Sequence, residues 1–323
     1  MSEYIRILKP ATAGSDLASA ARILDEIPAL DAAGGPVGAL TVALAWLAAG
    51  RAHRVRSALR TIEPDLAHLV PLLVGRYVAW TGDLRSAALS WPAVRQAAEC
   101  PAQNTGGTDE RIIAAATVVG LERTATDMGD PALAARLRAP ARDARMSLHR
   151  GAGSTLLALA LDVEPDPAQA WTGDGHTRLA SEQPLDAARF VLAAVHGLLG
   201  ISPDATRHRV WLRPRGVFDG EGLDVREIRV GDDSLNLRVD ATGDRLRVTV
   251  EQDAGPIPIT ALLEPLVPGT VRQTAVDGVD ARLAVRPAPG GSVVPVQLVL
   301  DHARTLEIER VAPAGNAEGP PTT

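Results

Sequence analysis

LDAARFVLAAVHGLLG (Leu185–Gly200) runs directly into ISPDATRHRVWLRPRG (Ile201–Gly216), and the character of the sequence changes where the two stretches meet. Before this junction, apolar residues recur at the spacing of amphipathic and buried helices. After it, apolar and polar residues alternate, which is typical of half-buried strands. The sequence therefore predicts a helical α/α domain over residues 1–205, an antiparallel β-sandwich over residues 206–312 and a disordered tail over residues 313–323.

Helical patterns separated by short breaks fill the part of the chain before the junction. The segment VGALTVALAWLAAG follows Pro36, which suits a first helical position, and it ends at Gly50. This segment is apolar around most of its circumference, as a helix between two other layers would be. Another helix is predicted from Pro64 to Trp80, where Gly82 lies in the turn that follows. Such breaks predict stacked αα-hairpins, with about eight helices in a partial toroid.

Strand patterns fill the part of the chain after the junction. The segments LDVREIRVGD, SLNLRVDA and DRLRVTVEQ alternate between apolar and polar residues. Turn residues separate them, first Gly231-Asp232-Asp233 and then Thr242-Gly243-Asp244. Because this spacing is typical of β-hairpins, the sequence predicts an antiparallel sandwich of short strands.

Composition narrows the class of protein. The chain has 323 residues and a net charge of −6, and Lys9 is its only lysine, so nothing indicates a nucleic-acid partner. The prevalence of Arg, Ala, Gly and Pro is typical of a GC-rich bacterial genome. No apolar run approaches the roughly 20 residues of a membrane-spanning helix. The first residues lack the apolar core of a signal peptide. We therefore expect a cytoplasmic protein without a membrane partner.

Motifs for metals and cofactors are missing from the sequence. Cys100 is the only cysteine, which excludes an intramolecular disulfide and a cysteine metal cluster. The seven histidines show no HxH or HExxH spacing, and no glycine-rich phosphate or dinucleotide motif occurs. The sequence therefore predicts neither a metal nor a cofactor.

Three segments, LLVGRYVAWTGDLRSAALSWPAVRQAAE (Leu72–Glu99), MGDPALAARLRAPARDAR (Met128–Arg145) and AARFVLAAVHGLLGISPDATRHRVWLRP (Ala187–Pro214), carry a family resemblance. They resemble the six-hairpin glycosidases, the toroid enzymes related to glucoamylase and to the amylo-α-1,6-glucosidase part of glycogen debranching enzymes. All three segments belong to the scaffold of that family. The resemblance implies a shortened helical toroid that leads into a β-sandwich, and a role in carbohydrate metabolism.

The resemblance also implies a pair of catalytic carboxyl groups. Glycoside hydrolysis needs one acid to protonate the leaving oxygen and one carboxylate to activate water or attack the sugar. Glu182 precedes the last toroid helix, where relatives place a base, although Ser181 and Glu182 also suit a helix start. Asp65 lies where relatives carry a substrate-contacting aspartate, and it also suits a helix cap. Asp109 and Glu110 follow the loop in which relatives carry an acid, and they also suit a first helical turn.

A polar stretch just before Glu182 supplies candidate sugar-binding residues. In AWTGDGHTRLASEQ, Trp171 is accompanied by Asp174, His176 and Arg178. An aromatic face with polar groups around it is the arrangement that a sugar site uses. A polar surface loop is the alternative interpretation of the same residues.

Two functions fit these observations. The first is a glycosidase that hydrolyses α-glucosidic bonds, with Glu182 as one carboxylate and Asp65, Asp109 or Glu110 as the other. The second is a catalytically inactive scaffold that binds carbohydrate or protein. An aromatic content of 3% and the short segment before Asp109 favour the second function. We expect an oligosaccharide or glucoside as the partner, and a homodimer that completes the toroid is a further hypothesis.

Overall fold

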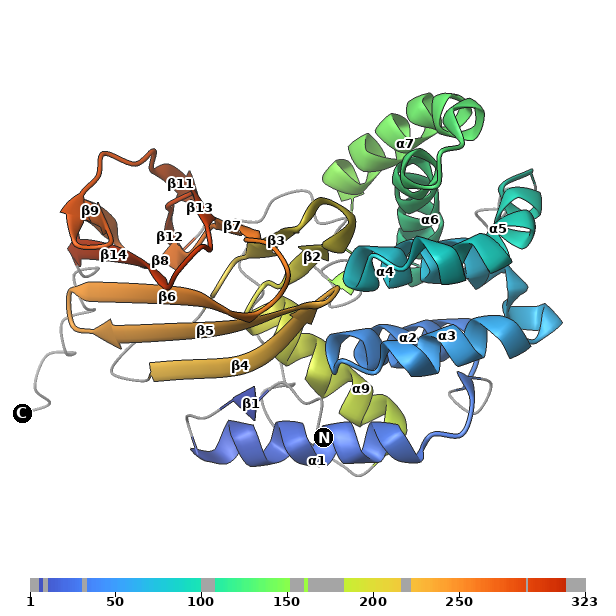
Figure 1. The fold of residues 1–323 in the computed structure, drawn as a ribbon, viewed down its shortest axis with the longest axis horizontal. Coiled ribbons are helices and arrows are strands. Elements are labelled where there is room, and N and C mark those ends of the chain that lie inside the picture. Colours follow the sequence, from blue (N-terminus) through green and yellow to red (C-terminus); the bar gives the residue numbers. More distant parts are fainter. Residues whose placement is uncertain are drawn as a thin grey trace, which may run out of the picture.

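A computed structural model of the protein describes residues 6–7, 11–30, 34–99, 108–151, 160–161, 183–215, 222–288 and 290–311. Helices gather on one side of the molecule and strands on the other (Figure 1), as the sequence predicts. The exception is a two-residue strand near the N-terminus, β1 (Arg6–Ile7), which pairs with a strand from the second half of the chain. The predicted tail over residues 313–323 lies outside the described residues.

Eight α-helices lie in the described residues before the junction. They are α1 (Ala11–Glu26), α2 (Pro36–Ala48), α3 (Ala52–Thr61), α4 (Val70–Thr81), α5 (Leu84–Glu99), α6 (Thr108–Asp127), α7 (Pro131–Gly151) and α9 (Pro184–Leu192). Three short turns accompany them, namely the 3-10 helices η2 (Pro64–Leu69) and η4 (Ala205–Arg207) and the π-helical segment η3 (Ala193–Leu198).

The helix predicted from Pro64 to Trp80 is two elements in the structure. Residues Pro64–Leu69 form η2, and the α-helix begins only at Val70. Pro71 explains the division, because it lacks the N–H group that a continuous α-helix would need to bond the preceding turn. The segment around Pro36 agrees with its prediction, since every residue from Gly38 to Ala48 of α2 is buried.

Three helices converge where the helical part meets the strands. Gly82, just after α4, would contact Ala205 of η4 if it carried a Cβ atom. Asp127 ends α6, and its carboxylate lies 2.9 Å from the guanidinium of Arg207 in η4. Helix α9 packs against α1 and α2 and continues through η3 to the strand that precedes η4. The first residues of α4, α6 and α9 therefore lie at the helix ends that are farther from the strands.

The strands form three sheets. Their bounds are β2 (Ser202–Asp204), β3 (Arg209–Leu212), β4 (Gly222–Val230), β5 (Asp233–Thr242), β6 (Arg245–Ala254), β7 (Thr260–Leu263), β8 (Leu266–Val267), β9 (Thr270–Val276), β10 (Val279–Asp280), β11 (Arg286–Ala288), β12 (Gly291–Val293), β13 (Val296–Val299) and β14 (Arg304–Val311). The largest sheet has the order β1-β4-β5-β6-β14-β9-β10, and two smaller sheets have the orders β13-β7-β3-β2 and β11-β12-β8. All these pairings are antiparallel except that of β3 with β7.

Burial alternates along the strands as the sequence predicts. In β6, Leu246, Val248 and Val250 are buried, whereas Arg245 and Arg247 are exposed. The predicted turns also occur, because Gly231 and Gly243 join β4 to β5 and β5 to β6 with φ values of +63° and +54°. Such left-handed values favour glycine, which has no Cβ atom to clash.

One hydrophobic core crosses the boundary between helices and strands. It extends from Ala20 and Leu24 of α1 through Trp46 of α2 and Val195 of η3 to Ile308 of β14. A smaller core lies between the helices α4, α5, α6 and α7. The helical and β parts therefore pack as one body around a shared core.

Candidate functional site

An open cleft of about 530 Å³ lies beside α3 in the helical part. One wall is the segment Pro28–Leu30 that follows α1, and the opposite wall is one face of α3. Trp46 of α2 and Leu66 of η2 also line it, and both are buried, with 2% and 6% of their surfaces exposed. Volumes of this size are typical of sites for small molecules.

The polar residues of the α3 wall repeat once per helical turn. His53, Ser57 and Thr61 are separated by four residues, so they lie in a row along one face of the helix. Val55 lies on the opposite face and is fully buried. Glu63, two residues beyond the end of α3, adds a carboxylate to the same cleft. The amphipathic pattern of α3 thus gives the cleft its polar wall.

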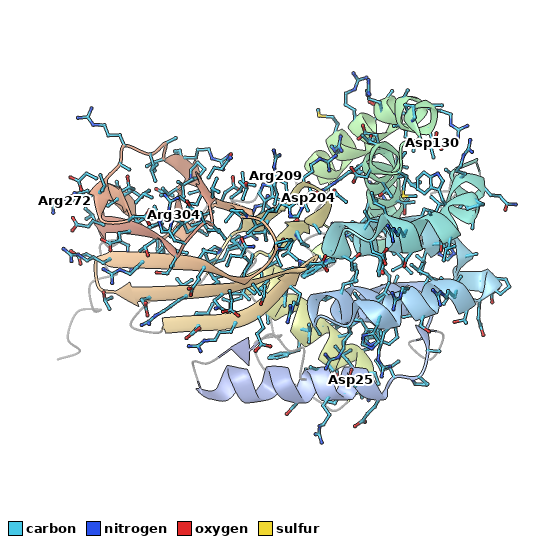
Figure 2. The ribbon with its side chains drawn as sticks, in the orientation of Figure 1. Asp25, Asp130, Asp204, Arg209, Arg272 and Arg304 are labelled. Atoms are coloured by element: carbon cyan, nitrogen blue, oxygen red, sulfur yellow. The ribbon has the colours of Figure 1, made fainter. Side chains whose placement is uncertain are left out.

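Side chains from α2 and the start of α3 bind the end of α1. The Trp46 indole N–H donates to the carbonyl oxygen of Leu24 at 3.0 Å. Arg51 donates to both carboxylate oxygens of Asp25, at 2.8 and 2.9 Å, and Figure 2 labels Asp25 near the end of α1. Arg54 donates to the carbonyl oxygens of Ile27, at 2.7 Å, and of Asp25.

The bonds from Trp46 and Arg54 satisfy carbonyl groups at and just beyond the end of α1, where a helix leaves such groups without partners. They also place positive charge at the C-terminal end of the helix dipole, where it is stabilising. Pro28–Leu30, which form one wall of the cleft, come just after this end of α1 in the chain, so the same contacts fix their position. Arg54 therefore supports the shape of the cleft as well as lining it.

Asp65 is the one predicted site residue whose side chain lies in the described part of the chain. It is exposed in the first turn of η2, between Glu63 and Leu66, which both line the cleft. Asp65 itself is not among the residues that line it. Asp65 lies in the first turn of η2, but Glu63 occupies the N-cap position and no side-chain capping hydrogen bond forms there, so the capping and substrate-contacting roles of Asp65 both stay predictions.

The other predicted site residues are placed only in part. Asp109 and Glu110 fall in the first turn of α6, while their side chains lie outside the described residues. Glu182 also lies outside the described residues. The same is true of the candidate sugar-binding residues Trp171, Asp174, His176 and Arg178. The structure does place the helices that these acids precede or begin. Because α4 and α6 both end at η4, Asp65 in the turn before α4, and Asp109 and Glu110 at the start of α6, lie at the opposite ends of these helices.

The residues that line the cleft are not among those predicted from the sequence. The spacing of His53, Ser57 and Thr61 is visible in the sequence and indicates a polar helical face. The sequence does not show which segment faces this row, because Arg54 of α3 reaches the carbonyl oxygen of Ile27, just after α1, only in the folded chain. Only the folded structure therefore reveals the cleft.

A second polar cluster lies at the junction of helices and strands, where Figure 2 labels Asp204. Arg123 of α6 lies 2.5 Å from the Asp204 carboxylate, which is almost fully buried. Arg207 contacts Asp127 at 2.9 Å and Asp204 at 3.4 Å. Burial raises the pKa of the Asp127 carboxyl, against the opposing effect of Arg207 and Arg123, and the charge of Asp204 adds to the rise. These groups pair with one another, so the cluster joins the two parts.

Other kinds of site are not evident in the described ranges. Among them, no group of three His, Cys, Asp or Glu side chains is placed to hold a metal ion. Within the same ranges, no helix is long and apolar enough to cross a membrane. A shallow hollow of about 340 Å³ on the largest sheet is lined by polar residues, including the ion pair of Arg247 with Glu307.

Comparison with known proteins finds similarity only among solved structures. No protein-family model matches the chain, and no curated protein matches its sequence. An α-L-rhamnosidase from Dictyoglumus thermophilum is 9% identical, with a TM-score of 0.47 over 77% of this chain and 40% of that one. A GH127 β-L-arabinofuranosidase from Geobacillus stearothermophilus T6 is 13% identical, with a TM-score of 0.26 over 79% of this chain and 43% of that one.

A third similar structure is a glycoside hydrolase that is 11% identical, with a TM-score of 0.26 over 77% of this chain and 46% of that one. All three solved structures are of glycoside hydrolases. The chain spans less than half the length of each. Similarity of this degree assigns neither a family nor an activity to the chain.

Proposed function

We propose that this chain is a glycoside-hydrolase-like protein of carbohydrate metabolism. The observation that supports this function is the convergence of α4, α6 and α9 on the strands. It leaves the first residues of these helices at the ends away from the strands, where the connection into α4 also forms part of a cleft. The resemblance of three scaffold segments to six-hairpin glycosidases supports the same conclusion.

The finer proposal is hydrolysis of α-glucosidic bonds by acid–base catalysis. Glu182 acts as one carboxyl group, and Asp65, Asp109 or Glu110 acts as the other. One group protonates the glycosidic oxygen as the bond to the sugar breaks, and the other takes a proton from the attacking water or attacks the sugar. Trp171, Asp174, His176 and Arg178 bind the substrate next to Glu182. No metal or cofactor takes part in this scheme.

A catalytically inactive carbohydrate-binding or protein-interaction scaffold is the second candidate function. One observation favours it, namely that Glu63 is the only carboxylate that lines the cleft among the described residues. Hydrolysis needs a pair. The proposal also includes a cytoplasmic location, an oligosaccharide or glucoside partner, and neither a membrane nor a nucleic-acid partner.

Hydrolysis is tested by measuring glucose release from maltose, isomaltose and trehalose. We expect wild-type activity on at least one sugar, and a loss of about a hundredfold or more in Glu182→Gln. One of Asp65→Asn, Asp109→Asn and Glu110→Gln should show a similar loss. Asp143→Asn removes an exposed acid of α7 and serves as the control. Wild-type protein that releases no glucose, or Glu182→Gln with full activity, contradicts this mechanism.

Self-association is tested separately. The proposed homodimer predicts twice the monomer mass in light scattering. A monomeric mass at high protein concentration rules it out.

A further inference from the structure

The polar wall of the cleft has the length of a small chain molecule. From His53 to Thr61 the helix advances eight residues, which corresponds to about 12 Å at the rise of an α-helix. Ser57 lies midway, and Glu63 extends the wall beyond the end of α3. A disaccharide spans such a row, whereas a single pyranose ring does not.

These side chains are available for a ligand. The side chains of His53, Ser57 and Glu63 are exposed, and none of them forms a hydrogen bond or ion pair with another described residue. The Thr61 hydroxyl makes one contact within the described ranges, a long one of 3.4 Å to the carbonyl oxygen of Ser57. The wall therefore offers an imidazole, two hydroxyl groups and a carboxylate, which together can donate to and accept from sugar hydroxyls.

The charges in the cleft disfavour an anionic ligand. Arg54 is the only arginine that lines it among the described residues, and its two terminal nitrogens donate to Ile27 and Asp25. Its guanidinium also lies 5.5 Å from the centre of the Trp46 ring. The guanidinium is thus already held against the backbone at the end of α1, which limits its capacity to bind a carboxylate or phosphate. Glu63 adds a negative charge that would repel such a group.

The floor of the cleft disfavours a stacked aromatic or sugar ring. Only 2% of the Trp46 surface is exposed, so its face is covered by the surrounding protein. Binding must then depend on hydrogen bonds from the α3 wall rather than on stacking. Since each such bond replaces one to water, its net contribution is small, and we expect weak affinity.

We propose that the cleft between Pro28–Leu30 and α3 is a binding site for a neutral disaccharide, with Glu63 and the hydroxyls of Ser57 and Thr61 as its recognition groups. This inference rests on the proposed function for the class of ligand. It adds the place, the size and the neutral charge of that ligand. It also assigns a role to Glu63, which lies outside the catalytic scheme above.

Calorimetric titration of the full chain tests this site, with maltose, isomaltose and trehalose as probes and gluconate as an anionic comparison. We expect at least one disaccharide to bind and gluconate not to bind. Glu63→Gln should weaken binding by about tenfold or more, because hydrogen bonds to a charged group are the stronger ones. The double variant Ser57→Ala/Thr61→Val should weaken it similarly.

Matched controls come from neighbouring positions outside the cleft. Arg60→Gln changes an exposed residue of the same helix, and Glu26→Gln removes an exposed acid at the end of α1. Both should bind the disaccharide as the wild type does. The thermal unfolding midpoints of Glu63→Gln and of the double variant should equal that of the wild type. Weaker binding would then result from the change in the cleft and not from a loss of folded protein.

The outcomes separate this inference from the proposed function. If no disaccharide binds at its solubility limit, or if Glu63→Gln and the double variant bind as well as Arg60→Gln, the inference is overturned, even where glucose release persists. If gluconate binds as well as the disaccharide, the neutral-ligand inference is overturned. If the disaccharide binds through Glu63 but no glucose is released, the inference stands and the hydrolase mechanism fails.

Discussion

The backbone amide of Gly231 donates to the carbonyl oxygen of Trp80 at 2.7 Å, so the turn between β4 and β5 closes the end of α4. A Cβ atom on Gly231 would lie 3.3 Å from the Cβ atom of Ala205 and 3.5 Å from the carbonyl oxygen of Thr81. Hairpin, helix end and η4 thus meet at one glycine. This contact is the clearest sign that the helical and β parts are fitted to each other.

Gly231→Ala should destabilise the protein by roughly 2–3 kcal/mol, because alanine is strained at a left-handed φ and would also crowd the junction. Gly243→Ala is the matched control, since Gly243 occupies an equivalent turn with nothing within 4 Å of a Cβ atom. Backbone strain alone should destabilise Gly243→Ala, by about 1–2 kcal/mol. Urea unfolding compares the two variants. Equal losses would show that the junction tolerates the methyl group.

Gly75→Ala and Gly120→Ala should have opposite effects, although both replace a glycine within a helix. Alanine favours helix by about 1 kcal/mol over glycine. At Gly75 of α4, however, a Cβ atom would lie 2.9 Å from the Thr124 hydroxyl of α6, whereas at Gly120 the nearest atom is 4.0 Å away. We expect Gly120→Ala to raise the thermal midpoint and Gly75→Ala to lower it. A rise in both variants would contradict the close packing of α4 on α6.

Asp83→Ala should destabilise the protein by about 1–2 kcal/mol near neutral pH. Asp83 caps α5, because its carboxylate accepts from the Ser86 amide at 2.9 Å, and it also accepts from the Tyr77 hydroxyl at 2.8 Å. Burial acts to raise the pKa of Asp83, but these hydrogen bonds outweigh it and hold the pKa below its usual value.

The sign of the pH dependence follows from that lowered pKa. The stabilisation by Asp83 is present above the usual Asp pKa and is lost as pH falls through the lower value of the folded protein. The gap in unfolding free energy between wild type and Asp83→Ala should therefore narrow in acid. Denaturant titrations at several pH values measure this gap, and a gap that widens in acid would refute the assignment.

Asp127→Asn should raise the free energy of unfolding near neutral pH by up to about 1 kcal/mol. The raised pKa of Asp127 means that its ionised form is disfavoured in the folded state. Arg207 would keep Asp204 as a partner and stays partly exposed, so no buried charge is left alone. The advantage of the variant should narrow as pH falls below the raised pKa and vanish below the usual Asp pKa, where Asp127 is neutral in both the folded and the unfolded protein.

Asp240→Asn is the control for this variant. It breaks an exposed ion pair of similar length, 2.8 Å to Arg238 on the largest sheet, and should change stability by less than about 0.5 kcal/mol. If Asp127→Asn lowered the free energy of unfolding by more than about 1 kcal/mol, the ion pair of Asp127 would stabilise the fold by more than its burial costs.

Local patterns in the sequence predicted the elements but not their neighbours. Pro36 and Gly50 enclose α2, and Gly231 and Gly243 mark hairpin turns, because proline and glycine act on the backbone at their own positions. The parallel pairing of β3 with β7 and the pairing of β1 with β4 were not predicted. Each joins segments far apart in the chain, and spacing within a strand carries no information about its partner.

The candidate site also has a part that the sequence predicts and a part that it does not. Asp65 could be assigned to a helix start from the proline before it, and the structure places it there. The cleft beside it depends on Arg51 and Arg54 reaching α1, contacts that span more than 20 residues. Sequence spacing cannot indicate such contacts. Residues predicted from the family resemblance, Glu182 first among them, remain predictions to be tested by substitution.

The core that runs unbroken from Ala20 to Ile308 has a consequence for how this chain can change over evolutionary time. Neither half can be transplanted as a ready-made module, because separating them would expose the apolar faces that each now covers on the other. Recombination that exchanges one half would have to bring a matching surface with it. The helices and strands are therefore expected to be inherited together, and insertions to be tolerated at the surface turns rather than at the junction.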